Sequence, residues 1–166
     1  VVVHKDGRGE VKNGAQAIGT GTRTGMAIVA AEELGIPVDK VTARLGDTDW
    51  PDGPPSGGSV TAASIFPPVR QAAFRARTLL LREVARGLGV AEGDVALEGG
   101  AVRVGSNTIP WDEACRLLSG DRVSALEKGR GVRAAYAEGT AGCQFAEVEV
   151  DTATGVVRVL RVVAVH

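Results

Sequence analysis

The longest regular pattern in this sequence is an apolar stripe that predicts one long helix, from about Thr61 or Ser64 to Arg86. Small and aliphatic residues recur there at helical spacing, namely Val69, Ala73, Ala76, Leu80 and Val84. The opposite side carries arginines, at Arg75, Arg82 and Arg86. Pro67 and Pro68 are expected in the first turn, where a missing N–H costs little. A helix with one apolar face must be covered by a second layer.

The segments before this helix predict two strands and a shorter helix. Strands are expected at 1–4 and 9–16, around a hairpin turn at Asp6-Gly7. Residues 25–34 have apolar side chains at helical spacing, and Gly35 fits the end of a helix. The remaining expected elements are a strand at 40–47, a hairpin at 94–105, a short helix at 110–118 and a hairpin at 143–165. The pattern therefore predicts a two-layer α+β fold, with helices packed on one side of a mixed or antiparallel sheet.

Composition indicates an aliphatic core and gives no electrostatic reason for a nucleic-acid or membrane partner. Of the 166 residues, 44% are hydrophobic but only 4% aromatic, and the formal net charge is −1. Cys115 and Cys143 belong to no Cys-x-x-Cys pattern, so we expect both as reduced core thiols of a cytoplasmic protein. No stretch has the length and apolarity of a membrane span.

The ends of the sequence favour a piece excised from a longer chain. It starts at Val1, without an initiator Met, and stops at His166, directly after a strand-like run. A final strand with nothing beyond it would leave an open sheet edge. Within 1–166, sub-lobes are expected at about 1–90 and 91–166.

Two stretches rich in glycine and hydroxyl groups each precede a predicted helix. Residues 16–25 are QAIGTGTRTG, and residues 56–64 are SGGSVTAAS. Backbone amides and small hydroxyls at a helix start can hold an anionic group. The first stretch is not a dinucleotide fingerprint, because Thr24 stands where a third glycine is needed. It is not a P-loop either, because no Gly-Lys-Ser/Thr follows.

A structural alternative stays open for both stretches. Ser56, Ser59 and Ser64 could be turn and cap residues only. Alternatively, two such loops across a common sheet could converge on one elongated anionic ligand. The loops lying close together would favour the ligand, and a wide separation would favour structural turns.

The sequence predicts no catalytic and no metal-ligating residue. Asp47 and Asp49 fit turn positions, and Glu147 and Glu149 alternate on an outward strand face. No serine or cysteine lies in a recognisable nucleophile elbow. The chain therefore contains groups that could hold a ligand, without a visible catalytic centre.

The order of these motifs resembles the molybdopterin-binding large subunit of the xanthine dehydrogenase / aldehyde oxidase family, in its bacterial form. The resemblance is carried by GAQAIGTGTRTGMAIVAAEELGIPVDKVTARLGDTDWPDGPPSGGSVTAAS and by GCQFAEVEVDTATGVVRVLRVVAVH. It spans nearly the whole chain and is weakest from about 91 to 139.

The resemblance implies that the anion is the phosphate of molybdenum-molybdopterin, or of its cytosine dinucleotide form. The implied cofactor-binding residues are Ile18, Gly19, Thr20 and Gly21 in the first loop, and Gly58, Ser59, Thr61, Ala62 and Ser64 at the second. It further implies an oxidoreductase that hydroxylates small aldehydes or N-heterocycles, with water as the oxygen source and the cofactor taking two electrons. Iron–sulfur and FAD subunits or domains are the implied partners.

Some positions depart from the family pattern. Thr20 stands where many relatives have Gln, and Val60 where many have Arg. The family's glutamate base falls outside the residues matched here. We therefore expect the isolated chain to be inactive and to hold little or no cofactor. The rival hypothesis is a non-catalytic binding or assembly domain whose glycine loops are structural turns.

Overall fold

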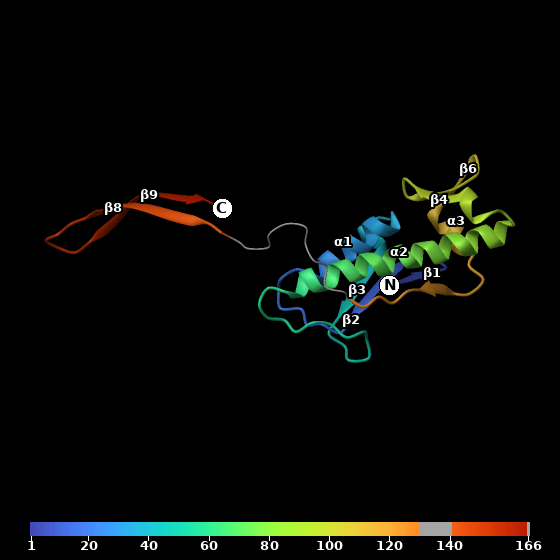
Figure 1. The fold of residues 1–166 in the computed structure, drawn as a ribbon, viewed down its shortest axis with the longest axis horizontal. Coiled ribbons are helices and arrows are strands. Elements are labelled where there is room, and N and C mark those ends of the chain that lie inside the picture. Colours follow the sequence, from blue (N-terminus) through green and yellow to red (C-terminus); the bar gives the residue numbers. More distant parts are fainter. Residues whose placement is uncertain (130–140, 166) are drawn as a thin grey trace. The chain divides into compact units, whose positions relative to one another are not determined.

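In a computed structural model of this chain, residues 1–129 and 141–165 are described (Figure 1). The chain divides into two compact units, Val1–Gly131 and Val132–His166. The division falls later in the chain than the boundary near residue 90 that the sequence suggested. Each unit is described in turn.

A four-stranded mixed sheet forms one layer of the first unit, in the order β3-β2-β1-β7. Its strands are β1 (Val2–His4), β2 (Gly9–Asn13), β3 (Val41–Leu45) and β7 (Arg122–Ser124). β1 is antiparallel to both its neighbours, and β2 and β3 are parallel, joined through α1. The first three strands confirm the sequence predictions. β7 was not anticipated from the sequence.

Two helices, α1 (Thr22–Leu34) and α2 (Thr61–Leu88), cover one face of this sheet (Figure 1). α1 packs on β2 and β3, whereas α2 packs on β1 and β7. Val3, Val11 and Val41 point from the strands into the buried layer between sheet and helices. This is the predicted two-layer α+β arrangement.

The end of α1 follows the predicted glycine signal. Gly35 has φ 66°, and its N–H donates to the Glu32 carbonyl at 3.2 Å. The Ile36 N–H donates to the Ala31 carbonyl at 3.0 Å, and the Ile36 side chain is buried. The helix therefore ends in a Schellman-type motif with an apolar latch.

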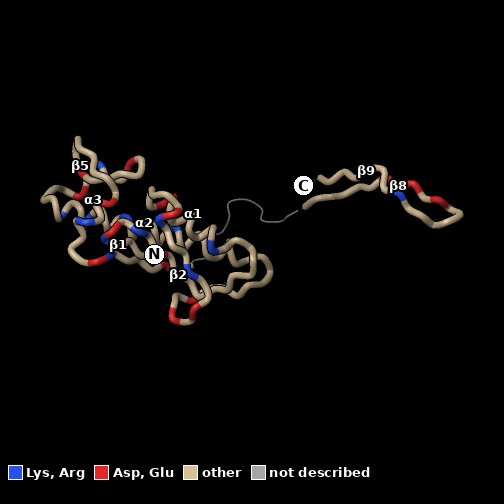
Figure 2. Tube along the Cα trace, turned by 180° about the vertical axis from the view of Figure 1, so that it is seen from behind, with Lys and Arg blue, Asp and Glu red and all other residues tan. Residues whose placement is uncertain are grey.

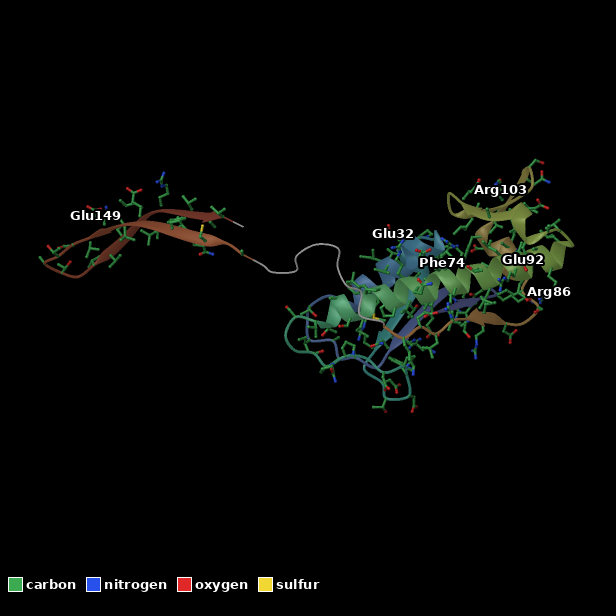
Figure 3. All side chains as sticks on the ribbon, viewed as in Figure 1. Glu32, Phe74, Arg86, Glu92, Arg103 and Glu149 are labelled. Carbon is green, nitrogen blue, oxygen red and sulfur yellow. The ribbon has the colours of Figure 1, made fainter. Side chains whose placement is uncertain are left out.

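The apolar stripe of α2 is buried along its length. All five predicted members lie in the core, namely Val69, Ala73, Ala76, Leu80 and Val84. The arginines of the opposite side are exposed, and Arg86 points away from the helix into solvent (Figure 3). The long-helix prediction is confirmed.

The expected position of the two prolines in that helix was wrong. α2 begins at Thr61, so Pro67 and Pro68 lie beyond its first turn. Neither proline can donate a hydrogen bond to the carbonyl four residues earlier, so the Ala63 and Ser64 oxygens lose their helical partner. The helix continues because Ile65, before the prolines, and Val69, after them, are both buried in the same core.

A second sheet and a short helix pack beside the C-terminal part of α2. The elements are β4 (Val95–Glu98), β5 (Ala101–Val104), β6 (Asn107–Pro110) and α3 (Trp111–Arg116). Two 3-10 turns, η1 (Val38–Lys40) and η2 (Glu92–Asp94), precede β3 and β4. The hairpin on Gly99 and Gly100 and the helix after Pro110 confirm the predictions, whereas β6 was missed.

The second unit contains one antiparallel hairpin, β8 (Cys143–Val150) and β9 (Val157–Val165), as predicted. One face is apolar except for Gln144, and its other members are Ala146, Val148, Val150, Val157, Val159, Val162 and Ala164. The other face carries two charge pairs together with Phe145, Val163 and Val165. Glu147 and Glu149 point outward on the other face, opposite Arg161 and Arg158, as Figure 3 shows for Glu149. Cys143 is exposed, so its expected core position was wrong, because a two-stranded hairpin has no second layer of its own.

Candidate anion-binding site

α1 and α2 lie side by side and run parallel. Gly25, in the first turn of α1, contacts Phe66 near the start of α2. Glu33, near the end of α1, pairs with Arg70 and Arg77 further along α2, at 3.2 Å and 3.0 Å. The two helix starts therefore lie at the same end of the helical layer (Figure 1).

Each helix start follows one of the two glycine-rich stretches, and a hydrogen bond joins them. We call Gln16–Gly21 the first loop and Ser56–Val60 the second loop. The Ser56 hydroxyl donates to the Gln16 carbonyl at 3.2 Å. Just before each loop, the Gly14 N–H donates to the Pro51 carbonyl at 2.8 Å. The structure thus places the loops next to each other.

The first loop depends on glycine for its backbone conformation. Gly19 has φ 89° and Gly21 has φ 76°, both left-handed. A Cβ at either position would meet no atom within 4 Å, so the space beside these glycines is open. The hydroxyl of Thr20, between the two glycines, lies 3.2 Å from the hydroxyl of Thr22, which follows Gly21. Ile18, at the tip, is 62% exposed.

The second loop contains two successive left-handed residues. Gly58 has φ 60° and Ser59 has φ 58°, and Ser59 is the one non-glycine residue with positive φ in 1–129 and 141–165. Such a backbone conformation is strained for serine. After it, Thr61 is buried and its hydroxyl donates to the Pro55 carbonyl at 3.4 Å. Ala62 is half-buried, and Ser64 is exposed.

No side chain caps either helix start. The N-cap residues are Gly21 and Val60, which have no side-chain oxygen to accept a bond. Ser56, Ser59 and Ser64 do not cap α2, whose start has no side-chain cap hydrogen bond, and the Ser56 hydroxyl bonds to the first loop. The first amides of both helices therefore have no side-chain capping partner in the described part of the chain. Parallel helix dipoles add a positive potential at this end.

Arg23, the second residue of α1, is the one charged side chain within the first turn of either helix. Residues 13–22 and 53–69 contain no Lys, Arg, Asp or Glu. Figure 2 shows both stretches without the colours of charged residues. An anion at this end would therefore meet mainly backbone N–H groups and hydroxyls, with Arg23 as the nearest cationic side chain in sequence.

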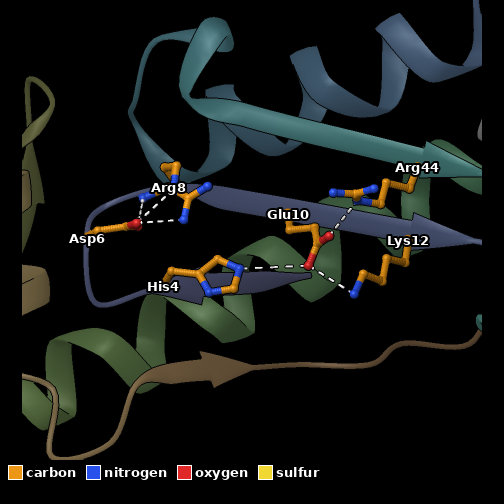
Figure 4. Close-up of polar contacts among 6 residues, drawn as sticks. All are labelled: His4, Asp6, Arg8, Glu10, Lys12 and Arg44. Carbon is orange, nitrogen blue, oxygen red and sulfur yellow. Dashed lines mark hydrogen bonds and ion pairs between the residues drawn. The ribbon is translucent and has the colours of Figure 1, made fainter.

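The densest charge cluster lies elsewhere, on the outer face of the main sheet (Figure 4). The Glu10 carboxylate accepts from Arg44 Nε at 2.8 Å and pairs with Lys12 Nζ at 3.0 Å. His4 Nε2 lies 3.7 Å away. Burial raises the pKa of Glu10, but the hydrogen bonds from Lys12 and Arg44 outweigh it and hold the pKa below its ordinary value. The cluster ties β1, β2 and β3 together.

Other singled-out residues have structural roles. The Asp47 carboxylate accepts from the Asp49 N–H at 2.9 Å, which confirms the predicted turn role. Trp111 is 4% exposed and its Nε1 donates to the Gly7 carbonyl at 2.8 Å. Burial raises the pKa of the Cys115 thiol to about 12, so this thiol is unreactive at neutral pH.

Within 1–129 and 141–165, no group of three or more His, Cys, Asp or Glu side chains is placed to bind a metal ion. Among the helices of these same residues, none combines the length and apolarity that crossing a membrane requires.

A family model described as "Molybdopterin cofactor-binding domain" matches residues 1–166. The aldehyde oxidoreductase molybdenum-binding subunit PaoC of Escherichia coli (strain K12) is 32% identical over 168 residues, covering 99% of this chain and 22% of the relative. A nicotinate dehydrogenase subunit of Pseudomonas putida (strain KT2440) is 36% identical over 105 residues, covering 61% of this chain and 9% of the relative. The chain therefore spans about a fifth or less of the length of these curated relatives.

Solved structures share the fold. Quinoline 2-oxidoreductase from Pseudomonas putida 86 matches with a TM-score of 0.71 and 22% identity, over 98% of this chain and 22% of that chain. Carbon monoxide dehydrogenase from Oligotropha carboxidovorans matches with a TM-score of 0.71 and 24% identity, over 98% of this chain and 21% of that chain.

Proposed function

Because this chain belongs to the molybdopterin cofactor-binding domain family, we propose that its two loops bind the phosphate groups of a molybdenum-molybdopterin cofactor. The observation that carries the proposal is the hydrogen bond from Ser56 to Gln16, which joins the loops at the starts of two parallel helices. An elongated anionic ligand can then contact both loops at once. The cytosine dinucleotide form would add a second phosphate along the same line.

The groups present fit a phosphate ligand. The uncapped amides at Thr22 and Thr61 supply donors, and the open side of Gly19 and Gly21 leaves room for phosphate oxygens. The Thr20 and Ser64 hydroxyls are exposed beside them. In this proposal the cofactor-binding residues are those the sequence singled out: Ile18, Gly19, Thr20, Gly21, Gly58, Ser59, Thr61, Ala62 and Ser64.

The whole protein is proposed to be a molybdenum-dependent oxidoreductase that hydroxylates small aldehydes or N-heterocycles. Similarity to an aldehyde oxidoreductase subunit and to a nicotinate dehydrogenase subunit supports this reaction class. The bound cofactor would supply the two-electron oxidation, while this chain holds and orients it. Iron–sulfur and FAD subunits or domains would carry the electrons away. Two free cysteines in the described chain support a cytoplasmic location.

Charge placed in the loops tests the proposal. Thr20→Glu puts a negative charge where phosphate would lie. In Thr20→Gln, the new side chain has nearly the same size as glutamate but carries no charge. Thr20 is exposed and its φ is not positive, so both variants fit the backbone. In the full-length protein assembled with its partner subunits, we expect Thr20→Glu to lower molybdenum and pterin content at least about tenfold, a difference of ~1.4 kcal/mol. Thr20→Gln should lose much less.

The second loop provides the matching comparison, Ser59→Glu against Ser59→Gln. Both substitutions keep the left-handed backbone strain, so only the charge differs. Metal analysis and pterin fluorescence of the assembled protein measure the result. Full cofactor content in both glutamate variants would show that the loops are structural turns. It would favour the alternative of a non-catalytic binding or assembly domain.

A further inference from the structure

We propose that the Phe66 ring, seated on Gly25, sets the separation of the two helix starts and so positions the two loops for one ligand. This inference rests on the proposed function and adds two positioning residues to it. Neither residue lies in the first loop or the second loop as defined above, although Gly25 is the last residue of the glycine-rich stretch 16–25.

The contact is closer than any side chain at position 25 would allow. Gly25 is the fourth residue of α1, and Phe66 is the sixth of α2. A Cβ on Gly25 would collide with Phe66 Cζ and would lie 2.9 Å from Cε1 and 3.0 Å from Cε2. The tip of the ring thus occupies the place of the missing side chain.

The backbone gives no other reason for glycine here. Gly25 is absent from the residues with positive φ, so alanine would fit its conformation. A glycine inside a helix costs about 1 kcal/mol relative to alanine. Local preference therefore opposes Gly25, and the packing against Phe66 accounts for it.

The position of the contact links it to both loops. The Gly25 N–H donates to the Gly21 carbonyl at 2.9 Å, so the contact lies one turn from the first loop. Phe66 lies two residues after Ser64. The Ser64 N–H donates to the Val60 carbonyl of the second loop at 2.9 Å. At the other end of α1, Glu33 is held by Arg70 and Arg77. A larger residue at 25 would therefore displace the Phe66 ring or separate the helix starts, while the far end stays paired.

The test uses two substitutions. The first places a methyl group where the ring lies, and the second removes the ring that would collide with it. Gly25→Ala in the assembled full-length protein should lower molybdenum and pterin content per folded protein at least about fivefold. The double variant Gly25→Ala/Phe66→Leu removes the ring that collides with the new methyl group. It should recover most of the cofactor, because the added methyl group no longer meets the ring. Cofactor is measured only on assembled protein from size exclusion, so that unfolded material does not contribute.

Gly87→Ala in α2 is the matched control. A Cβ there would lie 3.5 Å from the Leu117 Cβ, an ordinary contact, so cofactor content should not change. If Gly25→Ala yields no folded protein, the double variant carries the test, and its failure to recover cofactor would overturn the inference. Wild-type cofactor content in Gly25→Ala would also overturn it. Loss of cofactor in Thr20→Glu and Ser59→Glu but not in Gly25→Ala would reject the positioning role alone and leave the proposed function standing.

Discussion

Glu10 is the residue that joins most of the charges on the outer face of the main sheet. Its side chain is 15% exposed, while its partners Lys12 and Arg44 reach it from β2 and the adjacent β3. None of these groups lies in the loops. The charged residues of the sheet therefore support the fold, and the uncharged loops are left for binding.

We predict a pH-dependent contribution of Glu10 to stability. Because its pKa is lowered on folding from the ordinary 4.5, the contribution is present above that value and is lost as pH falls through the folded pKa. Glu10→Gln should lower the free energy of unfolding by about 0.5–1 kcal/mol at neutral pH. The difference from wild type should shrink as the pH falls through the lowered folded pKa of Glu10 and vanish in more strongly acid solution.

Urea unfolding of the 166-residue chain at the two pH values measures this effect. The control is Glu98→Gln, since the Glu98 side chain is 58% exposed in its pair with Arg103 and should contribute less. A difference for Glu10→Gln that persists unchanged in acid would contradict the assigned cause.

α1 and α2 end in the same way, at a glycine with a left-handed backbone conformation. Gly35 and Gly89 have φ 66° and 68°, and each N–H donates to the carbonyl three residues earlier at 3.2 Å. They differ in their surroundings. A Cβ at Gly35 would lie 3.0 Å from Leu97 Cδ2, whereas one at Gly89 would meet nothing within 4 Å.

Alanine at these two positions separates backbone strain from packing. Both Gly35→Ala and Gly89→Ala should destabilise the chain by roughly 1–2 kcal/mol, the cost of a left-handed residue with a Cβ. Gly35→Ala should lose more, because Leu97 must also move. Denaturant midpoints of the two variants give the comparison, and equal losses would show that Leu97 adapts without cost.

Elements with a clear period were predictable from sequence, and some short or tertiary features were not. The stripe of α2 and the β8–β9 hairpin each repeat over many residues. β7 has three residues and β6 has four, and both were missed, whereas β1, β4 and β5 are equally short but were found from the glycine turns that join them to a neighbouring strand. Sequence reasoning placed Pro67 and Pro68 in the first turn of α2, because that is where prolines are locally preferred. They lie in the second turn, where the apolar stripe, buried on both sides of them, stabilises the helix.

For the site, composition showed the loops but not how they meet. Two glycine-rich stretches before helices were visible in the sequence, and Ser56 was noted there only as a turn residue. The bond from Ser56 to Gln16 and the seat of Phe66 on Gly25 depend on two helices lying parallel. No local pattern specifies that arrangement, although a glycine within a helical segment is a signal of close packing.

At the scale of the whole molecule, this chain is one part of the length its relatives span. PaoC of Escherichia coli is covered over 22% of its length, so further segments of such a protein can complete a cofactor site. The first unit contributes two joined loops at one end of a helical layer. The hairpin contributes an apolar face that nothing else among residues 141–165 covers.

The most direct test is an experimental structure of the full-length protein with its cofactor bound. The account predicts cofactor phosphate oxygens about 3 Å from backbone amides at both loops, between Gly19 and Thr22 and between Ser59 and Ala62. Phosphates that contact neither loop, with Ser56 still bonded to Gln16, would contradict it.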